Sequence, residues 1–384
     1  MLKGNFPIKE FEGIRTPFYY YDLALLRRTL DTVRDIFREN PEYRLHYAVK
    51  ANSNPRILRT IASYGFGADC VSGGEIRAAL DAGFKPSKIV FAGVGKSDEE
   101  INLGLDAGIA RFNVESAAEL EVIDELAGKK GIVAPVSLRV NPDIGAHTHA
   151  NITTGLAENK FGINYEQLPS VLELTLKLQN VKFLGVHYHI GSQILDMEDF
   201  AALCNRANYV SESLAKAGVA PGDINLGGGL GIDYHHPNHL DIADFKAYFD
   251  TFKRFLKTTP GQLVHFELGR AIVAPCGSLI SRVLYVKEGI SRQFAIIDGS
   301  MTELIRPALY KAYHRVENIS SDEPEEIYDV VGPVCESSDV FAKGVSLDKC
   351  RRGDFIAIRS AGAYGESMAS GYNCHPLPGS YFNE

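Results

Sequence analysis

The sequence predicts an α/β protein: a (β/α)8 TIM barrel joined to a C-terminal β-domain that includes an N-terminal strand. Three observations support this prediction. Strand-like and helix-like patterns alternate eight times over about 240 residues, the number of units in such a barrel. No Gly-x-Gly-x-x-Gly turn follows the first of these strands, which disfavours the doubly wound open sheet that shares the alternation. From about Gly277 the pattern changes to short β-rich runs separated by turns.

The predicted barrel strands are short runs with alternating or continuous apolar residues. Their ranges are 44–50, 66–71, 88–93, 111–114, 135–140, 182–190, 223–226 and 263–268. Amphipathic helical patterns lie between them, for example at 74–82, 117–126, 168–178, 200–217 and 243–256. We expect the carboxyl ends of these strands to meet at one face of the barrel.

The predicted β-domain contains runs at 279–286, 294–298, 328–331 and 354–358. A strand-like run at 16–22 precedes an amphipathic helix that reaches about Glu39, and we expect residues 16–21 to pair into the β-domain. The predicted domains are therefore the barrel at 26–276 and a β-domain made of 1–25 and 277–384.

The composition is that of an ordinary globular protein, with 45% hydrophobic and 23% charged residues. A net charge of -8 argues against nucleic-acid binding. No apolar run is long enough to cross a membrane, and the first residues lack the apolar core of a signal peptide. The six cysteines form no disulfide framework or paired metal motif, so we expect reduced thiols and a cytoplasmic location.

The segment from Tyr43 to Asn54 suggests where the chemistry lies. Its first half alternates like a strand, and Lys50 closes it before Asn-Ser-Asn-Pro breaks the pattern. A lone lysine in this position most often emerges into solvent, because burying an ammonium without a partner is costly. The alternative is a lysine that forms a Schiff base, which a pKa lowered by burial assists.

Other unusual residues fall at the carboxyl ends of the predicted strands, where barrel enzymes hold their active sites. They are Asp69 on the second strand, Arg139 on the fifth, His189 and Ser192 at the sixth, Gly227, Gly228 and Gly229 after the seventh, and Glu267, Leu268, Gly269 and Arg270 at the eighth. This convergence favours a functional lysine at position 50.

The glycine triplet would let backbone N–H groups approach a phosphate, although a tight turn alone also explains it. Gly95-Lys96-Ser97 resembles a P-loop, but Val90 stands where the first glycine is required. Histidines at 147, 149, 235, 236 and 239 have no accompanying carboxylate or cysteine pattern, so we expect no metal there.

A lysine that can form an imine, a phosphate cradle and a buried carboxylate together indicate pyridoxal 5′-phosphate. We expect Glu267 beside the pyridine nitrogen, holding it protonated so that the ring accepts electrons during decarboxylation. We expect His189 to stack on the ring face, although a lone histidine at a strand end is more often an ordinary core residue.

Short motifs recur along nearly the whole chain. In the barrel they are Tyr47-Ala-Val-Lys50-Ala-Asn, Gly67-Ala-Asp-Cys-Val-Ser72, His147-Thr-His149 with Thr154-Gly, Lys160-Phe-Gly162, His189-Ile-Gly-Ser-Gln193 and Gly227-Gly-Gly-Leu-Gly231. In the β-domain they are Leu304-Ile-Arg306-Pro-Ala-Leu-Tyr310, Gly332-Pro-Val-Cys335-Glu336-Ser-Ser-Asp339, Gly362-Ala-Tyr364-Gly365 and Met368-Ala-Ser-Gly-Tyr372-Asn373.

These motifs resemble those of the diaminopimelate decarboxylases, pyridoxal-phosphate enzymes grouped with ornithine decarboxylase and alanine racemase. The resemblance implies conversion of meso-2,6-diaminopimelate to L-lysine and CO2, the last step of lysine biosynthesis. On the cofactor side it implies that Lys50 forms the imine, Ser192, Gly227, Gly228, Gly229 and Arg270 bind phosphate, Glu267 pairs with the pyridinium, His189 stacks, and Asp69, Arg139, Leu268, Gly269 and Tyr372 complete the site.

On the substrate side, the resemblance implies that Arg270, Arg306 and Tyr310 hold the distal carboxylate and that Glu336 takes the distal ammonium, with Tyr364 and Tyr372 close by. Arg306 and Tyr310 are four residues apart, so one helical turn would present both to one ligand. A planar guanidinium suits a carboxylate, although a surface ion pair between helices is the ordinary alternative.

The resemblance also implies a homodimer with shared active sites, in which the partner subunit supplies Cys335 and Glu336. Cys335 is then the candidate acid that protonates the substrate carbon after CO2 leaves. A buried structural cysteine is the commoner alternative. One position departs from the family pattern: Leu268 stands where the family usually has proline.

Three other functions remain open. A decarboxylase of ornithine or arginine type would leave Arg306 without a carboxylate partner. A racemase would pair the pyridine nitrogen with an arginine rather than with Glu267. A non-catalytic pyridoxal-phosphate carrier would be a single barrel without a β-domain.

Overall fold

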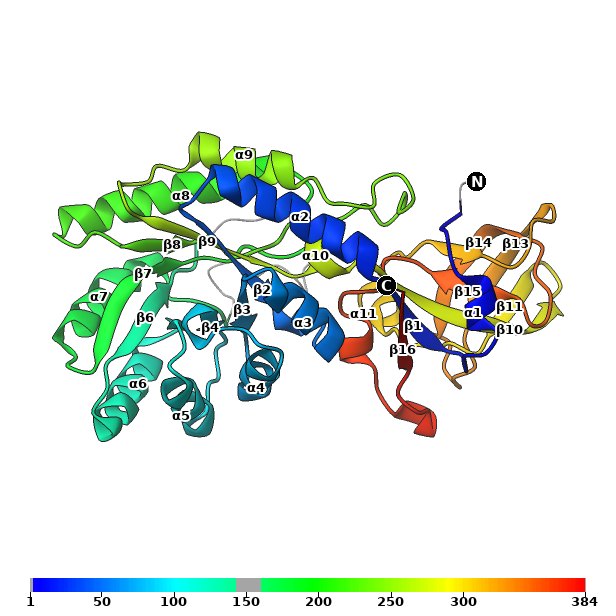
Figure 1. Ribbon diagram of the computed structural model, residues 1–384, viewed down its shortest axis with the longest axis horizontal. Helices are drawn as coiled ribbons and strands as arrows, with labels where there is room; N and C mark the ends of the chain where they lie inside the picture. The colour runs from blue at the N-terminus through cyan, green and yellow to red at the C-terminus, as the bar shows by residue number, and fades with distance from the viewer. Residues whose placement is uncertain (1–2, 143–159, 384) are drawn as a thin grey trace. The chain divides into compact units, whose positions relative to one another are not determined.

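The computed structural model describes residues 3–142 and 160–383 (Figure 1). The motif residues His147, His149, Thr154 and Gly155 lie outside these ranges. The chain divides into two compact units. The barrel unit comprises Leu30–Gly231 and Asp244–Gly269, and the β-unit comprises Met1–Thr29, Ile232–Ala243 and Arg270–Glu384.

The barrel unit contains a closed barrel of parallel strands in the order β2 to β9. The strands are β2 (Tyr43–Ala48), β3 (Gly67–Cys70), β4 (Ile89–Phe91), β5 (Arg111–Val114), β6 (Ala134–Arg139), β7 (Val181–His187), β8 (Asp223–Asn225) and β9 (Leu263–Leu268). The predicted TIM barrel is confirmed.

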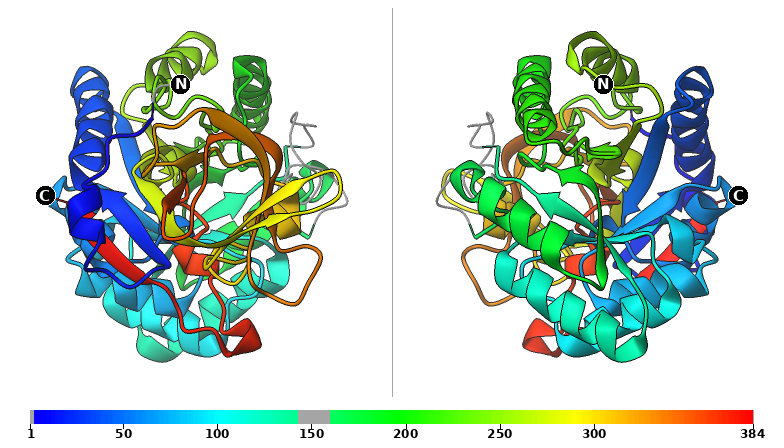
Figure 2. Two further views of the ribbon diagram at one scale, coloured as in Figure 1. Left: turned by 90° about the vertical axis from the view of Figure 1, so that its right-hand side faces the viewer. Right: turned by 90° about the vertical axis from the view of Figure 1, so that its left-hand side faces the viewer.

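Helices surround these strands on the outside (Figure 2). They are α3 (Pro55–Ser63), α4 (Gly73–Asp81), α5 (Asp98–Ala107), α6 (Ala117–Lys130), α7 (Leu168–Lys177), α8 (Met197–Lys216) and α9 (Phe245–Phe255). Their apolar faces pack on the strands through aromatic rings, for example Phe249 of α9 against Phe266 of β9, with ring centroids 5.0 Å apart. Phe37, near the end of α2 (Leu23–Glu39), packs edge-on against the same Phe249 at 5.2 Å.

Polar residues between a strand and the next helix start these helices. The side chain of Asn54 accepts a hydrogen bond from the backbone N–H of Arg56, and Pro55 occupies the first turn of α3. Ser97 and Glu100 form a reciprocal capping box at the start of α5. These caps satisfy backbone N–H groups that a helix start leaves unpaired, so each βα turn ends at a defined residue.

Lys50 does not end a strand, contrary to the prediction. Strand β2 stops at Ala48, and Val49–Ala51 form a 3-10 turn closed by a hydrogen bond from the backbone N–H of Asn52 to the carbonyl oxygen of Val49, at 3.1 Å. The side chain of Lys50 is 40% exposed rather than buried. The turn therefore places the lysine just beyond the barrel wall, where a ligand can reach its amine.

The β-unit contains one sheet with the strand order β12-β15-β10-β11-β13-β14. Its strands are β1 (Phe18–Asp22), β10 (Gly277–Glu288), β11 (Gln293–Ile297), β12 (Val316–Asn318), β13 (Glu325–Val331), β14 (Val340–Asp348), β15 (Phe355–Ile358) and β16 (Gly379–Asn383), with short helices α1 (Ile8–Phe11), α10 (Arg270–Val273) and α11 (Arg306–Tyr310). Strand β1 pairs with β10 and with β16, which confirms the expected pairing of the N-terminal run.

The core of the β-unit is a cluster of aromatic and aliphatic side chains that includes Phe11, Phe18, Tyr20, Ile280 and Phe355. Phe11 meets Phe18 edge-on at 5.1 Å and Phe355 at 5.9 Å. These residues come from widely separated parts of the sequence, so the unit closes only when they meet.

The expected domain ranges, 26–276 and 1–25 with 277–384, stay a prediction. The compact units differ from them by assigning residues 26–29, Ile232–Ala243 and residues 270–276 to the β-unit. In residues 3–142 and 160–383, no helix has the length and apolar content needed to span a membrane.

Candidate active site

The structure places the predicted site residues in two sets, one in each compact unit. The barrel unit holds Lys50, Asp69, Arg139, His189, Ser192, Gly227, Gly228, Gly229, Glu267, Leu268 and Gly269. The β-unit holds Arg270, Arg306, Tyr310, Cys335, Glu336, Tyr364 and Tyr372.

Lys50 and Asp69 form the reactive end of the barrel set. The lysine Nζ lies 3.6 Å from Oδ2 of Asp69, whose side chain is buried in β3. Burial and the nearby Glu267 raise the pKa of Asp69 to about 8, although Lys50 opposes this shift. The other oxygen of Asp69, Oδ1, is buried and has no hydrogen-bond partner among residues 3–142 and 160–383. A buried polar atom of this kind needs a partner, which a ligand at Lys50 can supply.

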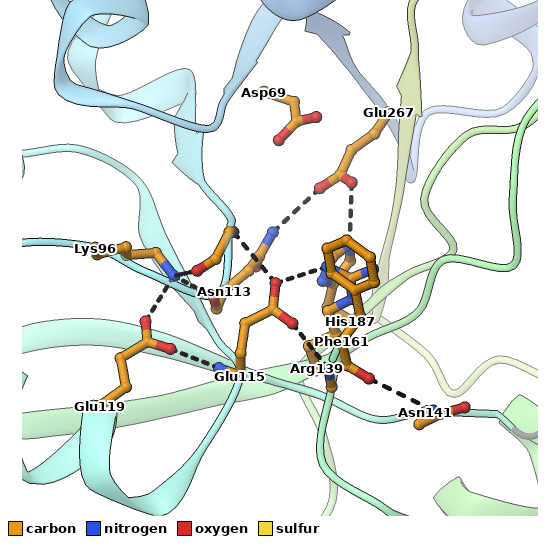
Figure 3. Close-up of polar contacts among 12 residues, drawn as sticks. Asp69, Lys96, Asn113, Glu115, Glu119, Arg139, Asn141, Phe161, His187 and Glu267 are labelled. Atoms are coloured by element: carbon orange, nitrogen blue, oxygen red, sulfur yellow. Dashed lines mark hydrogen bonds and ion pairs between the residues drawn. The ribbon is translucent and has the colours of Figure 1, made fainter. Parts of the chain in front are cut away.

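Glu267 is held by three donors inside the barrel. Figure 3 shows two of them, Asn113 and His187. Oε1 accepts hydrogen bonds from the side-chain amides of Asn113 at 3.1 Å and Asn225 at 2.7 Å, and Oε2 lies 2.9 Å from Nε2 of His187. Burial raises the pKa of Glu267, but His187 and Lys50 outweigh it and lower the pKa below its usual range. Three donors leave one of the four acceptor positions of the carboxylate free for a cationic ring N–H.

Asp69 and Glu267 therefore differ in ionisation although both are buried in one barrel. Figure 3 shows the two side chains beside each other. The pKa of Asp69 is raised and that of Glu267 is lowered, so Glu267 is the more readily ionised of the two. This separation supports Glu267 as the anion opposite a protonated ring nitrogen.

His189 lies just after β7, and the glycine triplet lies just after β8. Gly227 has a positive φ of 66°, and an added Cβ would lie 2.4 Å from the carbonyl oxygen of Tyr188. The N–H of Gly228 donates to Nδ1 of His189 at 3.3 Å, so His189 carries its proton on Nε2. Burial and nearby cations lower the pKa of His189 well below its usual range, so the ring is neutral and suited to stacking.

Only part of the triplet is available to an anion. The N–H of Gly227 donates to Oδ1 of Asn225 at 2.9 Å, and that of Gly228 is used by His189. The backbone of Ile194 pairs with Gly229 and Gly231, with hydrogen bonds of 2.9 Å. This pairing brings the segment containing Ser192 beside the triplet, as a shared phosphate site requires.

Arg139 is fixed by a carboxylate that the sequence did not single out. Its Nη1 lies 2.6 Å from Oε1 of Glu115, and Oε2 of Glu115 accepts the N–H of Gly162 at 2.8 Å. The guanidinium also lies 4.8 Å from the ring centroid of Phe161 (Figure 3). Both charges are buried, so the pair holds Arg139 in one orientation at the end of β6.

Lys96, which lies in the segment that superficially resembles a P-loop, belongs to the same network of buried charges as Arg139 and Glu115. Its buried Nζ donates to Oε1 of Glu119 at 2.6 Å and to the carbonyl oxygens of Gly93 and Asn113 (Figure 3). Glu119 in turn accepts the backbone N–H of Glu115 at 2.8 Å. Lys96 is thus a structural cation.

In the β-unit, Arg270 and Arg306 converge on one atom. Nη1 of Arg270 donates to the phenol oxygen of Tyr234 at 2.7 Å, and Nη1 of Arg306 donates to the same oxygen at 3.0 Å. The guanidinium of Arg270 also lies 4.9 Å from the ring centroid of Tyr364. Arg306 and Tyr310 are the first and last residues of α11, so the expected single helical turn is confirmed.

Cys335, Glu336 and Tyr372 form the exposed part of the β-unit set. The hydroxyl of Tyr372 donates to Oε1 of Glu336 at 2.7 Å, and Glu336 raises the pKa of Tyr372. Cys335 is exposed, which does not fit a buried structural cysteine. An exposed thiol beside a carboxylate is available to a ligand or to another subunit.

Sequence reasoning missed the residues that orient the predicted ones: Asn113, Glu115, His187, Asn225 and Tyr234. The two asparagines and the histidine share a recognisable signal, since they are polar residues within or at the end of the short strands β5, β8 and β7. Glu115 follows directly after β5, and Tyr234 lies in a loop with no periodicity.

A parallel barrel that carries a reachable lysine, an ionised buried carboxylate and a glycine turn at its strand ends defines a pyridoxal-phosphate enzyme of the barrel type. Residues 23–274 match the pyridoxal-binding domain of the pyridoxal-dependent decarboxylases. The chain belongs to this family, and the predicted cofactor and reaction class are confirmed.

Individual relatives are diaminopimelate decarboxylases. That of Bacteroides thetaiotaomicron is 61% identical over 383 residues, which cover 100% of this chain and 99% of the relative. That of Helicobacter pylori, solved in complex with L-lysine, has a TM-score of 0.90 and 39% identity, and the match covers 98% of this chain and 94% of that one. That of M. jannaschii, also with L-lysine, has a TM-score of 0.90, 35% identity, and coverage of 98% and 89%. A viral arginine decarboxylase at 22% identity and a TM-score of 0.85 shows the same fold.

Proposed function

We propose that this chain is a carboxy-lyase that converts meso-2,6-diaminopimelate to L-lysine and CO2, the last step of lysine biosynthesis. The observation that carries the proposal is the full-length identity of 61% with a diaminopimelate decarboxylase. The convergence of two buried guanidiniums, Arg270 and Arg306, supports a substrate with a carboxylate at its far end.

The barrel set fits pyridoxal phosphate, which when bound would supply an electron sink for the electron pair that stays on the substrate carbon when CO2 leaves. Lys50 is the residue that bonds the cofactor, and Glu267 has the charge and the free acceptor position to hold the ring nitrogen protonated. His189 provides a neutral ring for stacking. Around these, we assign Ser192, Gly227, Gly228, Gly229 and Arg270 to phosphate, and Asp69, Arg139, Leu268, Gly269 and Tyr372 to the remaining cofactor contacts.

The β-unit set fits the distal end of the substrate. We assign Arg270, Arg306 and Tyr310 to the distal carboxylate and Glu336 to the distal ammonium, with Tyr364 and Tyr372 near both. Arg306 forms no ion pair with a carboxylate in residues 3–142 and 160–383, so its charge is available to an acidic ligand. A decarboxylase of ornithine or arginine type is the second candidate. It ranks second because those substrates lack a distal carboxylate that could pair with Arg306.

Release of CO2 tests the proposal. Purified holoenzyme should release CO2 from meso-diaminopimelate and form L-lysine, with ornithine and arginine as control substrates. Faster release from either control would replace the proposal by the second candidate.

Arg306→Ala should weaken the binding of meso-diaminopimelate much more than the binding of ornithine. The variant loses a charge-assisted, bidentate contact worth about 1.5–3 kcal/mol, which corresponds to roughly a tenfold to hundredfold rise in KM. Steady-state kinetics with both substrates measures the difference. Arg292→Ala, at an exposed arginine paired with Asp329, is the control and should change neither value. An equal loss for both substrates would make Arg306 a structural residue.

We further propose a cytoplasmic homodimer with active sites shared between subunits. All six cysteines are free, as expected in a reducing compartment. The exposure of Cys335 and Glu336 supports their contribution to the site of a partner subunit, where the thiol of Cys335 donates a proton to the carbon that has lost CO2.

Mixing two inactive variants tests the shared site. A hybrid of Lys50→Ala and Cys335→Ala subunits contains one site with both residues intact, so random mixing should restore about a quarter of wild-type activity. The measurement is CO2 release before and after subunit exchange, with each variant alone as the control. The shared-site proposal fails if hybrids form, as native mass spectrometry can show, and activity does not return.

A further inference from the structure

Tyr234 lies between the two arginines of the β-unit set. Its side chain is buried, and its oxygen is the shared acceptor for Nη1 of Arg270 at 2.7 Å and Nη1 of Arg306 at 3.0 Å. We propose that Tyr234 is a positioning residue that determines specificity, because it holds Arg270 and Arg306 converged on the distal carboxylate of the substrate. This inference rests on the proposed function.

The hydrogen bonds of Arg306 orient its guanidinium. Its Nη1 donates one hydrogen to Tyr234 and the other to Nε2 of His314, at 2.8 Å. His314 accepts at Nε2 because its Nδ1–H donates to the carbonyl oxygen of Arg359 at 2.8 Å. Both hydrogens of Nη1 are therefore used. In the described part of the chain nothing pairs with Nη2 and Nε, and these two groups are a fork that binds a carboxylate in a bidentate manner.

His314 keeps this arrangement over the whole working range of pH. Burial and the charge of Arg306 lower the pKa of His314 to about 3. The ring is therefore neutral at any higher pH and remains an acceptor for Nη1. The rings of Tyr234 and His314 also meet edge-on, with centroids 5.1 Å apart, so the two acceptors of Arg306 support each other.

Two guanidiniums near one point repel each other, and Tyr234 offsets this repulsion. Its oxygen accepts from both cations, and its ring lies 5.1 Å from the guanidinium of Arg306. Burial raises the pKa of Tyr234, but Arg270 and Arg306 outweigh burial and lower it below its usual value. The two hydrogen bonds to this oxygen therefore keep the guanidiniums of Arg270 and Arg306 together.

The distal carboxylate keeps its charge throughout the reaction, since the bond that breaks is at the other end of the substrate. A residue that orients the arginines therefore stabilises the bound substrate and the transition state equally, which changes KM and leaves kcat unaltered. A merely structural tyrosine would lower kcat, cofactor content or thermal stability instead.

The test compares two ligands that differ only in the distal carboxylate: L-lysine, which carries it, and cadaverine, which does not. In Tyr234→Phe holoenzyme we expect the affinity for L-lysine, measured by calorimetry, to fall about tenfold or more. This corresponds to losing one charge-assisted hydrogen bond between the misoriented arginines and the carboxylate of the ligand. The affinity for cadaverine should stay within about twofold. The KM for meso-diaminopimelate should rise in parallel with L-lysine, with kcat unchanged.

Tyr248→Phe is the matched control, because Tyr248 is also buried in the interior and its hydroxyl has no hydrogen-bond partner among the residues that the structure describes. It should change neither affinity. Equal losses for both ligands in Tyr234→Phe, or no loss for either, would overturn the inference. If the wild-type enzyme releases no CO2 from meso-diaminopimelate, the proposed function alone is refuted. The two affinities still decide the role of Tyr234, because calorimetry needs no turnover.

Discussion

Replacement of Lys50 by alanine is expected to abolish turnover, with a loss of at least about a thousandfold in kcat, the scale typical of removing a covalent catalyst. The lysine is the only residue of the barrel set that can bond the cofactor, and the 3-10 turn at Val49–Ala51 brings its amine to 3.6 Å from Asp69. The variant should also lose the visible absorbance of the lysine-bound cofactor. CO2 release and an absorbance spectrum measure the two effects.

Lys182→Ala is the control for this substitution. Lys182 is an exposed lysine near the amino end of β7, away from the strand ends that carry the site. Its replacement should leave both the rate and the spectrum as in the wild type. A Lys50→Ala enzyme that turned over normally and kept the absorbance would show that another amine bonds the cofactor.

Glu267→Gln is expected to lower kcat by at least about a hundredfold while the cofactor stays bound. A neutral amide cannot hold the ring nitrogen protonated, so the electron pair left on the substrate carbon after CO2 departs loses its sink, whereas the phosphate contacts are unchanged. The structure adds a second effect. Asn113, Asn225 and His187 all donate to Glu267, and the amide nitrogen of glutamine would face at least one of these donors. We therefore also expect a stability loss of about 1–3 kcal/mol.

Two measurements separate these effects. Cofactor content and kcat report the electronic role, and a denaturant titration reports the stability loss. Glu119→Gln is the matched control for stability, since Glu119 is a buried carboxylate of the same barrel that pairs with Lys96. It should lose stability and keep most of its activity. If Glu267→Gln kept near-normal kcat, Glu267 would not be the partner of the ring nitrogen.

Much of the fold could be predicted because the barrel repeats one local pattern. The ranges 111–114 and 263–268 match β5 and β9 residue for residue, since turn residues and helix caps bound them on both sides. The predicted strand at 44–50 ends two residues beyond β2, because the sequence pattern continues past Ala48 whereas the backbone turns there, with a hydrogen bond from Asn52 to Val49.

The site was predictable where a chemical role needs a particular residue type, as for Lys50 and Glu267. It was not predictable where a residue acts by orienting another. His187 meets Glu267 from 80 positions away, and Tyr234 meets Arg306 from 72 positions away. No local pattern encodes such contacts, because they arise only when the strands and loops pack.

The pairing of β1 with β10 and β16 has a consequence for synthesis on the ribosome. All eight barrel strands lie between β1 and its partners, and Phe18 aligns with Ile280 and Gly379. At about 5–20 residues per second, β1 leaves the ribosome roughly 13–50 s before β10 does. The nascent chain therefore exposes an unpaired aromatic strand, Phe18–Asp22, while the barrel is being completed. An exposed strand of this kind attracts other strands, so chaperone binding to the growing chain should concentrate on it.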